Sequence, residues 1–583
     1  MSGLLKFLLC LRIRFNLSGK GGIYFYAVLA GIISAFVALA FKYASSCILS
    51  ILTGADGERV VAAFSQIPPW RRIFSLFAGG VLAGIVLLFA AKKIKKSPTP
   101  YMEAVSIGNG YIPVRANLLR SLAAIITIGS GTSIGREGPL VQTVAVFASV
   151  VGRRLRLSTP RLRLLIACSA AGAMASVFHA PLAGALFVCE IVIGVMSMEI
   201  IAPLMAASCT SYLVMCAISN PAPLYEISDA FLGVNLHTAL LSAVLGVAAS
   251  LLAKFWILWL NKTRKLLNRS GIAPLPIRLA AAGIAVGAIA IWYPEVTGNG
   301  AHIIRGLVNM NFSLEEISAI LALKIFSVAL FFGAGAVGGV LTPTLTIGCV
   351  FGFIFSQLLV LAGFPLGAEE IIGFSLLGMA AFFTTAAAAP LTSLMLVLEF
   401  TMAGHMIFPL AIGVLVSYSV SKITEAKSMY YSEASGGVKS VFNKPLKNVK
   451  VGDLFRKGYN TVSATTLFKN VAKIFIKNPD YAVYVVSRSN RYMGGILRSD
   501  VLEFVKSGTL SSNVIADDLM RTDIPKLNPS IPLVDGVKVF SENPTFDELP
   551  MVTADGKFYG IVNKNDIFMA FNELCARKKK PVL

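Results

Sequence analysis

Long apolar segments, broken by glycine and proline, fill most of the first 445 residues. They run near residues 23–52, 73–91, 117–128, 138–152, 164–196, 199–219, 237–260, 277–293, 315–332, 344–363, 370–400 and 406–421. A straight membrane span needs about 20 apolar residues, and several of these segments are much shorter or longer. Irregular backbone at membrane depth is tolerated only where it is buried in protein or lines a cavity. The pattern therefore predicts a polytopic membrane protein whose broken helices surround a buried centre.

Composition excludes the soluble alternatives. Hydrophobic residues make up 56% of the 583 residues and charged residues 14%, whereas soluble proteins average about 25% charged. The net charge of +22 arises mostly in residues 1–445, which hold 32 basic and 16 acidic side chains. Loops that face the cytoplasm and an anionic leaflet account for such a surplus. We expect neither enzymatic activity nor a nucleic-acid partner, and the eight cysteines, without a C-x-x-C pair, predict no metal site.

Two glycine-rich breaks repeat each other. Residues 129–139 read G-S-G-T-S-I-G-R-E-G-P, and residues 333–343 read G-A-G-A-V-G-G-V-L-T-P. Four identical pairs stand 204 positions apart: Gly129 and Gly333, Gly131 and Gly335, Gly135 and Gly339, and Pro139 and Pro343. Shared composition would explain a single match, but four matches at one offset favour an internal repeat.

A second block supports the repeat. Ala180-Pro181-Leu182 is followed by Glu190, and Ala389-Pro390-Leu391 is followed by Glu399, 209 positions later. We place the two repeats at about residues 23–219 and 237–424. Repeats with matching helix breaks are typical of transporters whose binding site lies between them near the midplane of the membrane.

The break at residues 129–139 has the features of an anion site. The first backbone N–H groups of a helix lack intrahelical partners, and the macrodipole places about half a positive charge there. Gly135 and Gly138 permit close approach of an ion to the backbone, and Pro139 suits a first helical turn. The segment 338–343 is expected to face this site from the second repeat.

Glu137 lies within this predicted anion site. A carboxylate at such a helix end can occupy the place of the anion, so that its protonation or displacement would admit the ion. The alternative is that Glu137 simply pairs with the adjacent Arg136. Ionisable side chains in membrane spans are usually functional, which favours the gating role.

Four motifs together resemble one family. G-R-E-G-P at 135–139, A-P-L-A-G-A-L-F-V-C-E at 180–190, G-G-V-L-T-P at 338–343 and K-S-M-Y at 427–430 are similar, in order and spacing, to the CLC family of chloride channels and proton-coupled chloride exchangers. The resemblance covers about residues 20–435. It implies a homodimer with one anion pathway per subunit, and an inverted repeat of tilted, broken helices.

The resemblance also implies the roles of particular residues. Glu137 is similar to the external gating glutamate, and Gly135, Arg136 and Gly138 surround it. The backbone amides of Val340 and Leu341, and the hydroxyl of Tyr430, resemble the donors to a central anion. Ser97 is the nearest candidate for the family's central serine, although it fits only with a gap of one residue. Tyr430 has an alternative interpretation as an aromatic anchor at the membrane interface.

Two departures from the family pattern bear on mechanism. Leu341 stands where the family usually has Phe, which leaves backbone donation intact. Ile191 follows Glu190 at the position where many exchangers carry a second glutamate that passes protons to the cytoplasm. Isoleucine cannot relay a proton, which favours a channel or an uncoupled carrier. Water could replace the missing carboxylate, and the retained Glu137 inclines us towards exchange, with Glu137 and Glu190 on the proton pathway.

The C-terminal part reads as a soluble domain. Two blocks, at 449–510 and 511–574, each predict a strand, a polar turn, a second strand and a helix begun near Asp500 or Asp566. They resemble a tandem pair of cystathionine-β-synthase (CBS) domains, in which an aspartate at the Asp566 position binds the ribose of an adenine nucleotide. Both aspartates also fit as ordinary helix N-caps. The usual Ser or Thr three residues earlier is replaced by Leu497 and by Asn563.

The remaining segments complete the predicted organisation. Residues 1–22 read as a basic helix at the membrane interface, residues 436–448 as a linker and residues 575–583 as a basic tail near anionic lipid. We thus expect an all-α polytopic membrane protein, a CLC-type inverted repeat of broken helices, followed by a small α/β CBS-pair domain.

We expect this protein to exchange chloride for protons across the cell inner membrane, with its CBS domains in the cytoplasm and an adenine nucleotide as their regulatory ligand. Its expected partners are lipid, small anions, protons and a second copy of the chain. The first alternative is a passive voltage- or pH-gated chloride channel. A CBS-regulated divalent-cation transporter would need inward-facing carboxylates in its spans, and few exist here. A membrane-anchored nucleotide sensor would have little use for repeated broken helices.

Overall fold

The computed structural model describes two parts of the chain. In the helical part the described residues are 20–54, 60–93, 100–106, 110–155, 157, 159–194, 196–219, 232–269 and 273–430. In the C-terminal part they are 449–454, 460–477, 482–497, 499–501, 504, 514–543, 546, 548–564, 566, 567 and 570. The chain divides into two compact units, a helical one over 24–152 and 162–434, and a second that contains 435–583 with 1–23 and 153–161.

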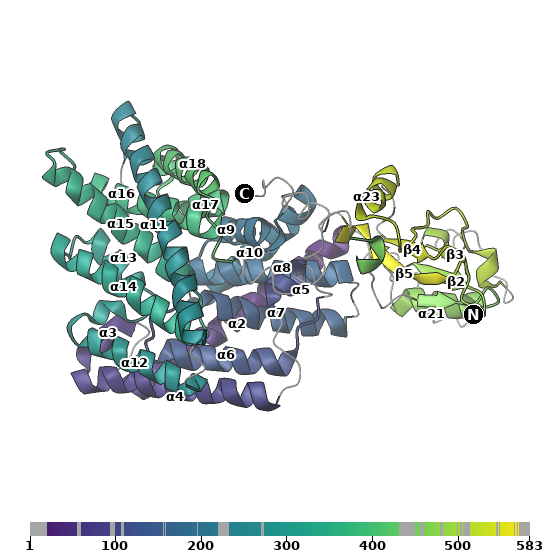
Figure 1. Cartoon of the computed structure of the whole chain (residues 1–583), viewed down its shortest axis with the longest axis horizontal. Helices are drawn as coiled ribbons and strands as arrows, with labels where there is room; N and C mark the ends of the chain where they lie inside the picture. The colour runs from purple at the N-terminus through teal and green to yellow at the C-terminus, as the bar shows by residue number, and fades with distance from the viewer. Residues whose placement is uncertain are drawn as a thin grey trace. The chain divides into compact units, whose positions relative to one another are not determined.

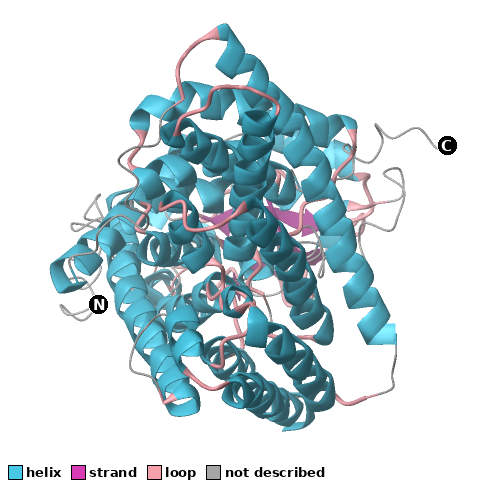
Figure 2. Cartoon of the chain, turned by 90° about the vertical axis from the view of Figure 1, so that its left-hand side faces the viewer, coloured by secondary structure: helices cyan, strands magenta, loops and turns pink. Residues whose placement is uncertain are grey.

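Ten helices among the described residues are long and apolar enough to cross a membrane. They are α2 (Lys20–Thr53), α4 (Pro69–Lys93), α8 (Thr159–Phe178), α10 (Met198–Ser219), α11 (Leu236–Arg269), α12 (Leu275–Trp292), α14 (Leu314–Ala334), α15 (Leu341–Leu361), α16 (Ala368–Ala387) and α18 (Ile407–Ile423). Figures 1 and 2 show that helices make up nearly all of this unit.

Shorter helices lie between the long ones. They are α3 (Val60–Gln66), α5 (Tyr101–Ser106), α6 (Val114–Gly129), α7 (Glu137–Arg154), α9 (Pro181–Phe187), the π-helix η1 (Val188–Ile193), η2 (Pro294–Val296), α13 (Ala301–Val308), α17 (Pro390–Thr401) and η3 (Gly404–Met406). The long apolar runs at 164–196 and 370–400 are each split, because the separate helices α9 and α17 begin at Pro181 and Pro390. The first parts of these runs are central: 83% of the span Arg161–Phe178 and 94% of an 18-residue window of Ala368–Ala387 are buried.

The two repeats have the same backbone conformation at their breaks. Gly131 and Gly335, 204 positions apart, have φ of 93° and 99°, a region that glycine adopts without steric cost. His179 and Ala388, 209 positions apart, have φ of 53° and 59°. The agreement extends to His179 and Ala388, whose side chains differ. It confirms the internal repeat and, with the buried centre, the expected fold class of the membrane unit.

The second unit contains two small sheets. In the first, β1 (Asn460–Val462) pairs in parallel with β2 (Val483–Val486), which pairs antiparallel with β3 (Tyr492–Ile496). In the other, β4 (Glu548–Val552) pairs antiparallel with β5 (Phe558–Asn563). The helices are α21 (Phe468–Lys477) and α23 (Leu533–Glu542), with short turns η5 (Val451–Leu454) and η6 (Ala516–Asp518). Both predicted strand–turn–strand blocks are present; the short strand β1 is an addition.

The two blocks share one core. Tyr484 of β2 and Tyr492 of β3 pack against Phe558 of β5, with ring centroids 5.3 and 6.0 Å from it. The Phe558 N–H donates to the Asn490 carbonyl at 2.8 Å. Burial, and then the nearby Glu548 carboxylate, raise the pKa of the Tyr484 phenol well above its ordinary value. The phenol therefore stays neutral and donates to Glu548.

Several predictions lie outside the described residues. Ser97, the linker 436–448 and the tail 575–583 are among them. Of the predicted interfacial helix at 1–22, residues 20–22 belong to α2 and the rest is not described. The proposed domain boundaries stay predictions.

Candidate functional site

The two glycine-rich breaks meet in the helical unit. The Gly135 N–H donates to the Gly339 carbonyl at 2.7 Å, and the Gly339 N–H donates to the Gly135 carbonyl at 2.7 Å. This pair of hydrogen bonds joins the α6–α7 connection to the α14–α15 connection. It brings together the N-terminal ends of α7 and α15, each of which carries partial positive charge. The facing of segments 129–139 and 338–343, expected from the repeat, is thus seen.

Glu137, the first residue of α7, lies in the notch between these connections. Its side chain is 2% exposed, and the Thr342 hydroxyl donates a hydrogen bond to its Oε1. Its Oε2 is buried, has no hydrogen-bond partner among the described residues, and lies beside Gly135 and Gly339, where a methyl group would crowd it. The side-chain hydrogen-bond donor to the carboxylate is therefore Thr342 of the second repeat, and the adjacent Arg136 also interacts with the carboxylate electrostatically.

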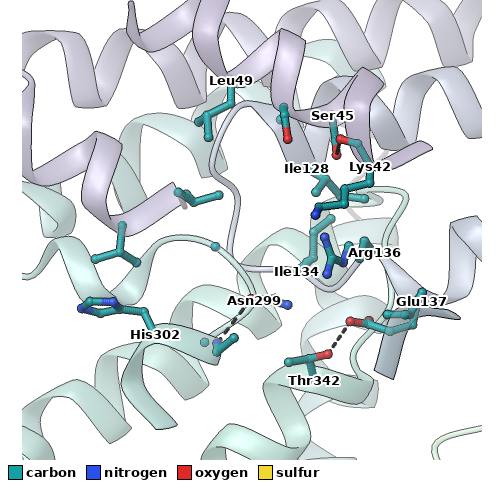
Figure 3. Close-up of a pocket in the computed structure, with 18 of the residues that line it drawn as sticks. Lys42, Ser45, Leu49, Ile128, Ile134, Arg136, Glu137, Asn299, His302 and Thr342 are labelled. Atoms are coloured by element: carbon teal, nitrogen blue, oxygen red, sulfur yellow. Dashed lines mark hydrogen bonds between the residues drawn. The ribbon is translucent and has the colours of Figure 1, made fainter. Parts of the chain in front are cut away.

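A cavity of about 390 Å³ adjoins this carboxylate. Figure 3 shows Glu137 and Thr342 side by side in its wall, with Lys42 and Arg136 nearby. Among the described lining residues, the basic side chains are Lys42, Arg136, Arg305, His179 and His302, and the single carboxylate is Glu137. With neutral histidines the lining carries a net charge of +2, which favours anions over cations in the cavity.

A buried lysine supports the wall of the cavity. Lys324 of α14 is 1% exposed, and its Nζ donates to the carbonyls of Val296 at 2.8 Å and Gly298 at 2.7 Å. The Gly298 N–H in turn donates to the Gly131 carbonyl at 2.9 Å. Gly298 lines the cavity, so Lys324 links this wall to the first glycine-rich break.

The predicted inner donors gather at the start of α15. Val340 is the N-cap of this helix and Leu341 its first residue. Met429 packs against the cluster that contains Val340, and its N–H donates to the Ala386 carbonyl at 2.8 Å. The neighbouring Tyr430 ring meets Phe187 edge-on at 5.9 Å. Met429 thus lies near the start of α15 and Tyr430 packs against α9, while anion contact by the Tyr430 hydroxyl stays a prediction.

Comparison with known proteins identifies the family. The model of the voltage gated chloride channel family matches residues 78–422, and the CBS domain model matches residues 451–507 and 515–573. The chain belongs to the CLC family of voltage gated chloride channels. Chloride transport is accordingly its general function.

Individual CLC relatives agree. A ClcB-like chloride channel protein of Ralstonia nicotianae is 34% identical over 410 residues, which cover 69% of this chain and 95% of the relative. The structure of a slow cyanobacterial Cl⁻/H⁺ antiporter matches with a TM-score of 0.62 at 20% identity, over 70% of this chain and 96% of that one. The structure of a eukaryotic CLC transporter matches with a TM-score of 0.62 at 17% identity, over 93% and 97%. These two structures support the fold.

Two acidic residues of this CLC protein cap helices across the repeat. Glu190 accepts hydrogen bonds from the N–H groups of Leu391 at 3.1 Å and Thr392 at 2.7 Å, in the first turn of α17. Glu399 accepts from the N–H groups of Leu182 at 2.9 Å and Ala183 at 2.7 Å, in the first turn of α9. Each carboxylate thus neutralises the positive helix end of the other repeat.

This capping gives Glu190 a structural partner that the sequence did not suggest. Ile191 follows it in the π-helix η1 and is half-buried. π-Helical turns are frequent at functional sites, so the irregular geometry here is compatible with a role in transport. The proton pathway through Glu137, Glu190 and the Ile191 position stays a prediction.

In the CBS pair, the two aspartates differ from simple N-caps. Asp500 lies inside its first helical turn and accepts a hydrogen bond from the Leu497 N–H at 2.8 Å. Asp566 lies in the helical turn that follows β5 and is half-buried. Asn563, at the position of the usual Ser or Thr, is 8% exposed.

Sequence reasoning missed several of these residues. Thr342 lies inside the quoted G-G-V-L-T-P motif, but nothing in one sequence shows that its hydroxyl meets Glu137. Lys42 and Lys324 could have been suspected, because each is a cation within an apolar segment. His302 and Arg305 come to the cavity only through the fold.

Proposed function

We propose that this CLC protein exchanges chloride for protons, and that Glu137 is the gate. The observation that carries the proposal is the buried Glu137 carboxylate in the notch between the starts of α7 and α15. There it holds the position in which two helix ends favour an anion.

The proposed gate works by competition. While ionised, the carboxylate is itself the anion at the notch and closes the path. When it takes up a proton, it loses the charge that the two helix ends attract, and chloride from the cationic cavity can replace it. The same side chain would then carry one proton for each such replacement, which couples the two movements.

The proposed proton route runs between Glu137 and the cytoplasm. We favour exchange because Glu137 is present, with water in place of an inner carboxylate. A passive chloride channel is the second candidate, and the observation in its favour is Ile191, which offers no titratable group.

Purified protein in liposomes tests both candidates. We expect an imposed chloride gradient to drive uphill proton uptake, whereas chloride flux without proton movement would identify a channel. In Glu137→Gln, whose amide imitates the protonated side chain, we expect proton uptake to be lost and chloride flux to become nearly independent of external pH. The control is Glu315→Gln, an exposed carboxylate of α14. Unchanged pH dependence in Glu137→Gln would rule out the gate.

For the rest of the molecule we propose a homodimer in the cell inner membrane with its CBS pair in the cytoplasm. We also propose that an adenine nucleotide regulates transport through Asp566. The half-buried position of Asp566 supports ribose binding. The buried Asn563 argues against it, because it replaces the Ser or Thr that the family usually has there. Calorimetry of the full protein with ATP, compared with Asp566→Ala, tests this part: equal heats in both would refute it.

A further inference from the structure

The side chain that donates a hydrogen bond to Glu137 comes from the second repeat. We propose that Thr342 is a positioning residue of the gate, whose hydroxyl stabilises the ionised Glu137 side chain in the notch. This inference rests on the proposed gating role of Glu137. It assigns a function to a hydroxyl that the backbone-mediated anion site does not require.

Thr342 differs from the other threonines of its helix. Thr344 and Thr346 donate their hydroxyl hydrogen bonds to the carbonyls four residues earlier, those of Val340 and Thr342. This is the local bond that helical threonines usually make. Thr342 instead donates across the repeat to Glu137 Oε1. Its hydroxyl therefore contributes to the gate rather than to its own helix.

The surroundings make this hydrogen bond important. Thr342 is 3% exposed and Glu137 is 2% exposed, so this hydrogen bond is buried. Since Oε2 of Glu137 has no hydrogen-bond partner among the described residues, the Thr342 bond is the one side-chain hydrogen bond described for the carboxylate. A hydrogen bond to a buried charged group shifts an equilibrium roughly 10- to 100-fold. Removing the hydroxyl should shift the gate towards its open state by a similar factor.

Thr342→Val tests the inference, because valine keeps the branched shape and lacks the hydroxyl. The readout is chloride flux in liposomes across a range of external pH. At alkaline pH, where ionised Glu137 closes the path, we expect about 10-fold more flux than in the wild type. Thr342→Ser restores the donor and should return flux to near the wild-type level. Thr346→Val is the matched control, since it removes a buried hydroxyl of the same helix that bonds only locally.

The same substitution made in the Glu137→Gln variant separates a positioning role of Thr342 from a general effect on folding. In Glu137→Gln the ionised gate no longer exists, so adding Thr342→Val should leave flux unchanged. An equal increase in both backgrounds, or a Thr342→Val pH profile identical to that of the wild type, would overturn the inference. If Glu137→Gln itself retained normal pH dependence, the proposed gate would fail instead, and the two failures are therefore distinguishable.

Discussion

Tyr430 combines a structural contact with a predicted chemical role. Its ring lies edge-on against the buried Phe187 of α9, and its backbone N–H donates a hydrogen bond to the Ser428 hydroxyl oxygen at 3.2 Å. The Ser428 hydroxyl donates in turn to the Ala387 carbonyl at 2.8 Å. The segment is thus fixed to the end of α16 independently of the Tyr430 hydroxyl. Ring and hydroxyl can therefore be tested separately.

We predict that Tyr430→Phe weakens chloride binding several-fold, up to about 10-fold, because a dehydrated anion loses one donor while the ring contact remains. Tyr430→Ala should weaken binding at least as much and also change the preference among anions, because the Phe187 contact is lost. Calorimetric titration of purified protein with chloride and other halides measures both. Tyr24→Phe, at an exposed ring, is the control. Wild-type affinity in both Tyr430 variants would show that the hydroxyl does not bind the anion.

The connection between α12 and α13 shows how one side chain fixes an irregular element. Val296 ends the short turn η2, and the carbonyl groups of residues 296–298 point to Lys324 of α14. The Ser133 hydroxyl also donates to the Val296 carbonyl. Within the described part of the chain the hydrogen-bond partners of the Lys324 Nζ are carbonyl oxygens, so a buried amine without a bonded carboxylate lies behind the cavity wall.

We predict that Lys324→Met destabilises the protein by roughly 3 kcal/mol, because two buried carbonyls each lose their hydrogen-bond donor. Chloride flux should also fall, since the cavity wall at Gly298 loses the side chain that holds it. Thermal unfolding of the detergent-solubilised protein and liposome flux measure the two effects. Lys324→Arg should retain part of both, and Lys262→Met, at an exposed lysine of α11, should change neither. Wild-type unfolding in Lys324→Met would exclude the supporting role.

For the helices, the sequence predicts where some of them break better than it predicts the side-chain contacts made at the breaks. Glycine and proline punctuation located the two connections that meet at Gly135 and Gly339. The apolar runs at 164–196 and 370–400 nevertheless read as continuous, because the left-handed residues before their breaks are His179 and Ala388, not glycine. The contacts of Thr342 and Lys324 were not predictable, since they join residues more than 25 positions apart through side-chain geometry.

The whole membrane unit is an interlocked pair of halves. Glu190 of the first repeat caps α17 of the second, and Glu399 of the second repeat caps α9 of the first. The matching A-P-L and Glu positions indicated a repeat, but only the fold shows that the caps are exchanged between the halves. A proline at the first position of α9 and of α17 has no N–H, so these carboxylates satisfy the first available donors.

We predict that Glu190→Gln and Glu399→Gln lower the free energy of unfolding by similar amounts, about 1 to 2 kcal/mol each, because each loses a charged acceptor at a helix N-terminus. Unfolding of the purified protein measures this, with Glu369→Gln at an exposed helix start as the control. Liposome proton uptake, recorded in parallel, separates capping from proton transfer at Glu190. Normal stability with lost coupling in Glu190→Gln would favour the proton pathway over the cap.

The exchanged caps also constrain how the chain is made. A ribosome releases Glu190 long before Leu391 and Thr392 exist, and α9 must wait for Glu399, some 216 residues after Ala183. The first half is therefore made with a helix start, that of α9, which its own residues cannot cap. Contacts of such long sequence separation form late and slowly. The newly made first half is thus committed to wait in the membrane, incomplete, until nearly the entire second half has been inserted beside it.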